Sequence, residues 1–122
     1  MRDFEQLKVW ERSHRLTLVV YEATAAFPKE EKYGLKSQIR RSCASVPANI
    51  AEGCGRGSNT DLARFLQMSL GSASELQYHL RLACDLSYLN HHAYERLTEE
   101  VIEIKRMLTS FIDNLRAFAS QT

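Results

Sequence analysis

The sequence predicts an all-α protein: an antiparallel, up-down-up-down four-helix bundle in which residues 1–122 form one domain. Apolar residues recur every three or four positions through most of the chain, which is the spacing of a helix with one buried face. Only five glycines and two prolines interrupt this pattern. The strict alternation of apolar and polar residues that is typical of strands is nearly absent. A chain of this length can bury a core without disulfides or structural metals.

The first helix is expected over Leu7 to Ala26, because the residue before Pro28 is pushed out of the α region. Its apolar residues form two stripes, Leu7, Trp10, Leu18 and Tyr21 on one and Leu16, Val19, Val20, Ala23 and Phe27 on the other. Either the core face is wide, or a second subunit covers one of the stripes. The second alternative predicts a homo-oligomer.

The second helix is expected from roughly Gly34 to Cys54, with a kink at Pro47. Proline has no N–H to donate to the Cys43 carbonyl, and in a helix interior it costs about 3 kcal/mol. An apolar stripe runs beside a polar one; the first is Ile39, Cys43, Val46, Ile50 and Cys54, and the second is Gln38, Arg41, Ser45, Asn49, Glu52 and Arg56.

Two interpretations fit this interrupted helix. In the first, which we favour, it is a kinked core helix in which Ser45 or Asn49 satisfies the freed carbonyls. Glu52 is then a buried partner of Arg41 or Arg56 from a neighbouring helix or subunit. In the second, the kink presents Asn49, Glu52 and the arginines to a binding partner.

The third helix can be capped by Ser58, Asn59 or Thr60 and is expected to extend to about Tyr88. Its centre consists of small residues, Ser69 and Gly71-Ser72-Ala73-Ser74. Because small side chains let two helix axes approach closely, we expect tight packing there.

We expect Asn90 to cap the fourth helix, which has the clearest pattern in the chain. Its apolar residues alternate three and four positions apart, and they are Tyr94, Leu97, Val101, Ile104, Leu108, Phe111, Leu115 and Phe118. This 3.5-residue repeat predicts knobs-into-holes packing against antiparallel neighbours.

Positive charge is concentrated in the first half of the chain, although the net charge is only +1. Residues 1–64 hold eleven Lys and Arg against eight Asp and Glu, whereas residues 65–122 hold five against seven. Lys36, Arg40 and Arg41 form either a ridge that contacts phosphates or, as is more common, the solvated face of a helix.

The sequence offers no catalytic or metal-binding pattern. A di-iron bundle needs a Glu on each of two helices and a Glu-x-x-His on each of the others, but the chain has only Glu75 and His79, one residue too far apart. The glycine-rich run 53–58 contains no GKS or GKT and follows no predicted strand, so it is not a phosphate loop. No Ser, Cys or Thr lies beside an activating base. We therefore expect no enzymatic activity, no metal, no cofactor and no small-molecule substrate.

The sequence also predicts a cytoplasmic protein without a membrane span. No stretch approaches the roughly twenty apolar residues of a transmembrane helix, and the N-terminus lacks the apolar core of a secretion signal. The cysteines Cys43, Cys54 and Cys84 have no CxxC spacing, so we expect them to be reduced, buried hydrophobes.

The chain resembles the four helix bundle protein family, also called the 23S rRNA intervening sequence proteins. The most specific match is the run Ser45-Val46-Pro47-Ala48-Asn49-Ile50-Ala51-Glu52-Gly53. Further matching residues are Phe4, Leu7, Val9, Trp10, Phe27-Pro28, Glu31, Tyr33-Gly34-Leu35, Gln38-Ile39-Arg40-Arg41, Phe65-Leu66, Gly71-Ser72-Ala73 and Glu75-Leu76. The resemblance implies a bacterial helical bundle without established enzymatic activity.

The resemblance extends in fold to the accessory variability protein of diversity-generating retroelements. That protein is a homopentamer that binds nucleic acid and a reverse transcriptase, so the resemblance favours a pentamer and an RNA or nucleoprotein partner. The candidate contacts are Lys32, Lys36, Arg40, Arg41, Arg56 and Arg64. The alternative is a protein–protein interaction module without nucleic-acid affinity, in which Asn49 and Glu52 are the anchors.

Overall fold

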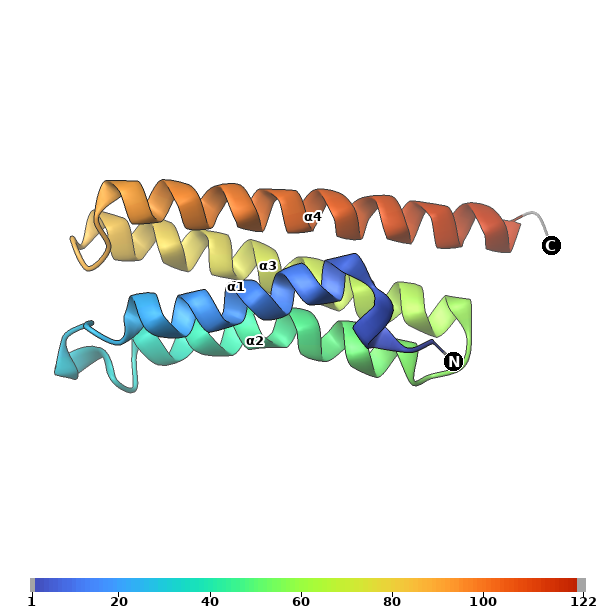
Figure 1. Cartoon of the computed structure of the whole chain (residues 1–122), viewed down its shortest axis with the longest axis horizontal. Coiled ribbons are helices and arrows are strands. Elements are labelled where there is room, and N and C mark those ends of the chain that lie inside the picture. Colours follow the sequence, from blue (N-terminus) through green and yellow to red (C-terminus); the bar gives the residue numbers. More distant parts are fainter. Residues whose placement is uncertain (1, 121–122) are drawn as a thin grey trace.

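The computed structural model describes residues 2–120, with side chains through residue 118. The described part contains four α-helices, α1 (Lys8–Thr24), α2 (Leu35–Cys54), α3 (Asn59–Asp85) and α4 (His91–Ser120), and two 3-10 turns, η1 (Phe4–Gln6) and η2 (Lys29–Glu31). Successive helices run antiparallel, and α4 returns to lie beside α1 (Figure 1). The predicted all-α four-helix bundle is confirmed.

Helix ends follow the caps expected from the sequence. The Ser58 hydroxyl accepts a hydrogen bond from the Asp61 backbone N–H at 3.1 Å, and the Asn90 side chain accepts one from the Ala93 N–H at 2.8 Å. These bonds satisfy N–H groups that a first helical turn leaves without partners. The third helix ends earlier than predicted, because Ser87 adopts a left-handed φ of 66°.

The core is one continuous cluster to which all four helices contribute. Its most completely buried side chains include Val20 of α1, Ile39 and Ile50 of α2, Leu66, Leu76 and Leu80 of α3, and Leu108 of α4. On α4 one predicted core residue is wrong, since Phe118 is 58% exposed while Ile112 is buried. The last turns of α4 extend past the other three helices (Figure 1), and Phe118 lies near the end of this helix, which ends at Ser120.

Helix α2 continues through the buried Pro47 without a break in helical assignment, and the kink expected there stays a prediction. The Asn49 amide donates to the Ser45 carbonyl at 2.9 Å. From α3, the Ser69 hydroxyl donates to the Val46 carbonyl at 2.8 Å. Asn49 therefore bonds within its own helix. Its acceptor is the Ser45 carbonyl, whereas the carbonyl that loses its usual backbone donor at Pro47 is that of Cys43.

Small residues have different roles on α2 and α3. A Cβ added to Gly53 would lie 2.8 Å from the Phe65 Cβ, so the close approach of α3 requires a glycine there. Ser69 and Ala73 are buried, as expected for tight packing. Gly71 is exposed, and an added Cβ would meet nothing within 4 Å. Tight packing within the chain therefore does not explain Gly71.

Candidate functional site

The six basic residues proposed as nucleic-acid contacts do not form one surface in a single chain. Lys32, Lys36 and Arg40 lie near the start of α2, whereas Arg56 and Arg64 lie beyond its far end. The interval from residue 40 to residue 56 corresponds to about 24 Å along a helix. Arg41 is exposed on the outer side of α2.

Arg40 is largely committed to holding α1 against α2. Its Nε donates to the Thr24 hydroxyl and its Nη2 to the Tyr21 carbonyl, each at 2.9 Å. The guanidinium carbon also lies 4.4 Å from the centre of the Tyr21 ring. A guanidinium with these three contacts is less available to a phosphate than an unpaired one.

Arg56 and Arg64 cover the aromatic ring of Phe65 at the start of α3. Both guanidinium carbons lie 4.9 Å from the ring centre, at a distance suited to cation–π attraction. Arg64 also lies 3.6 Å from the Asp61 carboxylate. Both arginines remain exposed and can contact a partner.

The polar stripe of α2 faces solvent. Glu52 and Arg41 are exposed, and within residues 2–118 neither forms an ion pair. The expectation that Glu52 is buried is thus wrong for a single chain, because α2 turns its apolar stripe inward and this stripe outward. A partner for Glu52 in another subunit stays a prediction.

Bulky apolar residues are left uncovered on the outside of α1. Of the two predicted stripes, Leu16, Val20 and Phe27 are buried, whereas Leu18 is 57% and Val19 46% exposed. We call the helical surface formed by Arg15, Leu18, Val19 and Glu22 the α1 outer face. These residues follow the i, i+3, i+4, i+7 spacing of a helical contact surface.

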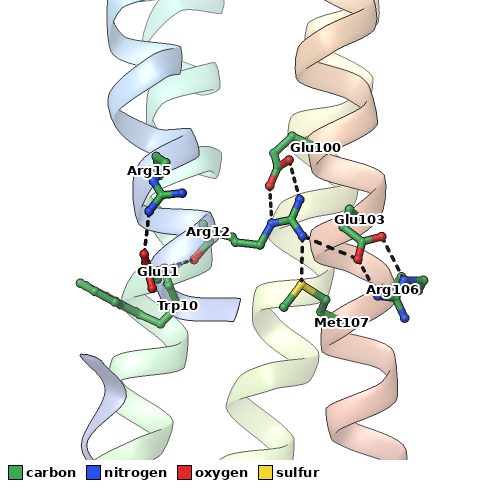
Figure 2. Close-up of polar contacts among 9 residues, drawn as sticks. Trp10, Glu11, Arg12, Arg15, Glu100, Glu103, Arg106 and Met107 are labelled. Carbon is green, nitrogen blue, oxygen red and sulfur yellow. Dashed lines mark hydrogen bonds and ion pairs between the residues drawn. The ribbon is translucent and has the colours of Figure 1, made fainter. Parts of the chain in front are cut away.

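A groove of about 730 Å³ lies between α1 and α4, with apolar side chains such as Leu16, Val19 and Leu97 among its lining. Arg12 is also among its lining residues and reaches from α1 to α4 (Figure 2). Arg12 Nε and Nη2 donate to the two carboxylate oxygens of Glu100, each at 2.8 Å.

Glu103 and Met107 complete the surroundings of this guanidinium. The Arg12 Nη1 lies 3.7 Å from a Glu103 oxygen and 3.9 Å from the Met107 sulfur. The hydrogen bond with Glu100 raises the pKa of Arg12. Hydrogen bonding to Arg106 lowers the pKa of Glu103, and the charge of Arg12 lowers it further. The cluster therefore joins α1 to α4 as a charged clamp.

Neither this clamp nor the groove was predicted from the sequence. The available signal was the position of Glu100 directly before the core residue Val101, because charged residues that flank the core positions of coiled coils pair across helices. Spacing along α4 alone could not show that the partner is Arg12.

The described residues contain no cluster of three or more His, Cys, Asp and Glu side chains that could hold a metal ion. Burial raises the pKa of the Cys43 thiol to about 11, so this cysteine is protonated and unreactive at neutral pH. In the part of the chain that was described, none of the helices is both long and apolar enough to cross a membrane.

Comparison with known proteins places the chain in a family. The model of the 23S rRNA-intervening sequence proteins matches residues 5–110. The chain belongs to this family. A solved protein from Bacteroides thetaiotaomicron VPI-5482, described as having unknown function and belonging to the S23 ribosomal protein family, has a similar structure. The TM-score is 0.77 at 27% sequence identity, over 85% of this chain and 97% of that one. No curated protein matches significantly.

Membership in the 23S rRNA-intervening sequence family confirms the resemblance found in the sequence. The matched residues 5–110 contain the run from Ser45 to Gly53 and the Phe65-Leu66 pair. The same range includes α1, α2, α3 and the clamp residues Arg12, Glu100 and Glu103.

Proposed function

We propose that this protein is a non-enzymatic cytoplasmic helical bundle that assembles with copies of itself through the α1 outer face. The observation that carries the proposal is the exposure of Leu18 and Val19, two bulky apolar neighbours on one helix. Burying such side chains contributes about 1.5 to 3 kcal/mol each when burial is complete. The family resemblance favours five subunits, and we adopt this number as part of the proposal.

Light scattering tests the assembly. The wild-type protein should have several times the 14.0 kDa mass of one chain, and Leu18→Glu should reduce the mass to that of a monomer. Ile102 on α4 is a matched control, because it is 52% exposed and its replacement by Glu adds the same charge. A monomeric wild type, or an unchanged mass in Leu18→Glu, would contradict the proposal. A stable dimer would contradict only the pentamer.

A second candidate function is binding to RNA or a nucleoprotein. It is favoured by residues 32–51, which contain Lys32, Lys36, Arg40 and Arg41 and no Asp or Glu, and by the ribosomal family name given to the solved relative. An oligomer would repeat this cationic segment in every subunit and so offer many phosphate contacts at once. Structured RNA that fails to bind at low salt would eliminate this candidate and leave the interaction module.

A further inference from the structure

The outer side of α2 carries a surface that the bundle itself does not use. Its centre consists of the small residues Ala44, Ser45 and Ala48, all at least partly exposed. Arg41 stands at one end of this centre and Glu52 at the other, both exposed and neither ion-paired within the described part of the chain. We call these five residues the α2 outer face. A surface of small residues lets another helix approach closely.

The α1 outer face has the complementary features. Its centre consists of the bulky, exposed Leu18 and Val19. Arg15 precedes them by one turn and Glu22 follows by one turn. Glu22 has no ion pair among residues 2–118, and Arg15 bonds only to Glu11 of its own helix, at 2.6 Å on an exposed surface. Such an exposed pair is weak and can be exchanged for another partner.

The order of charges selects a direction for the contact. Along the chain, both faces begin with an arginine and end with a glutamate, with Arg15 and Glu22 on α1 and Arg41 and Glu52 on α2. Parallel helices would therefore bring like charges together, whereas antiparallel helices bring opposite charges together. The charges are about 10 Å apart on α1 and about 16 Å apart on α2, a difference that extended arginine side chains can span.

We infer that the α1 outer face of one subunit packs antiparallel on the α2 outer face of a second copy of this chain. Leu18 and Val19 then cover the small centre of α2, Glu22 faces Arg41 of the partner subunit, and Arg15 faces Glu52 of the partner subunit. The inference rests on the proposed self-assembly and names the surface that receives α1. Because the two faces differ, a contact in which each subunit gives its α1 outer face to one neighbour and its α2 outer face to another is heterologous, and it forms a ring when the rotation between subunits closes.

A charge exchange tests this pairing. Glu22→Arg alone and Arg41→Glu alone should each place like charges in the interface and lower the light-scattering mass to that of a monomer. The double variant restores one opposite pair and keeps the wild-type net charge of +1, so it should recover the wild-type mass. Asp113→Arg, a charge reversal at an exposed carboxylate of α4, should leave the mass unchanged. Circular dichroism spectra should show that every variant remains helical.

The outcomes separate this inference from the proposed function. Full assembly of Arg41→Glu, or a double variant that stays monomeric, would overturn the α1–α2 pairing even if Leu18→Glu still dissociates the protein. Unchanged assembly of Leu18→Glu would overturn self-assembly through α1 and the pairing together. An equimolar mixture of the two single variants gives a further check. Each variant supplies the face that the other has lost, so mixing them should restore masses above that of a monomer.

Discussion

At the scale of single residues, Asn49 decides whether the central motif of α2 is structural. Its side-chain amide donates to the Ser45 carbonyl at 2.9 Å and is only partly exposed. Asn49→Ala removes this bond and should cost about 1 kcal/mol in the free energy of unfolding, measured by urea denaturation in the monomeric Leu18→Glu background. Glu52→Gln in the same background is the control and should change stability by less than about 0.5 kcal/mol, since Glu52 is exposed. If Asn49→Ala leaves the urea midpoint of unfolding unchanged, the role of Asn49 is partner recognition instead.

Two glycines in helices should respond in opposite ways to the same substitution. Gly53→Ala puts a Cβ 2.8 Å from Phe65 and 3.0 Å from Leu62, so α2 and α3 must separate, and we expect a loss of about 1 to 3 kcal/mol. Gly71→Ala meets nothing within 4 Å and should add up to about 1 kcal/mol, because alanine is the better helix former. Thermal melting in the Leu18→Glu background compares them. Equal shifts of the same sign would contradict the packing described here.

At the scale of helices, the interactions of Glu103 with Arg106 of α4 and with Arg12 of α1 make the stability of the bundle sensitive to acid. The pKa of Glu103 lies below its ordinary value of 4.5, mainly because of the hydrogen bond with Arg106 and also because of Arg12. A carboxyl with a lowered pKa stabilises the folded state above its unfolded pKa, and this stabilisation disappears as the pH falls through the folded value. Glu103→Gln should therefore lower the melting temperature at pH 7 and have progressively less effect below about pH 4.5.

Asp113→Asn supplies the control for that titration. Asp113 is exposed on the same helix and has no ion pair among the described residues. Its substitution should shift the melting temperature equally little at pH 3 and pH 7. If Glu103→Gln lowers the melting temperature as much at pH 3 as at pH 7, the packing of this side chain, rather than its charge, supports the α1–α4 contact.

The helices themselves were predictable from the sequence, because periodicity and capping act locally. Ser58 and Asn90 cap the helices they were expected to cap. Depth of burial was less predictable, since it depends on neighbours in three dimensions. Phe118 continues the apolar repeat of α4 but is exposed near the end of the helix, and Gly71 lies in a run of small residues but is exposed as well.

At the scale of the whole molecule, the candidate site was harder to derive than the fold. Six basic residues lie within a 33-residue stretch, but helix geometry separates them into groups at opposite ends of α2, and Arg40 is committed to Tyr21 and Thr24. That part of the apolar surface of α1 would be exposed could be anticipated, because two apolar stripes can exceed what a single core covers. Which residues are exposed could not, since the α1 outer face combines Leu18 of one predicted stripe with Val19 of the other. The clamp depends on which two helices become neighbours, which spacing along the chain does not specify.

RNA affinity is a property of the assembled molecule, and its salt dependence counts phosphate contacts. Each lost contact should reduce the slope of log K against log salt by about 0.7 to 0.9. Arg56 and Arg64 suit this test, because both are exposed and lie over Phe65 rather than inside the bundle. If they contact phosphates, the double alanine variant should reduce the slope by about 1.4 to 1.8 and leave the oligomer mass unchanged.

Lys105→Ala is the control, because Lys105 bonds to Gln77 at 3.0 Å in the C-terminal half, away from the cationic segment. A slope that the double variant does not alter would remove these arginines from the nucleic-acid surface, and the remaining affinity would then have to come from Lys32 and Lys36, since Arg41 faces Glu22 of the partner subunit in the inferred interface.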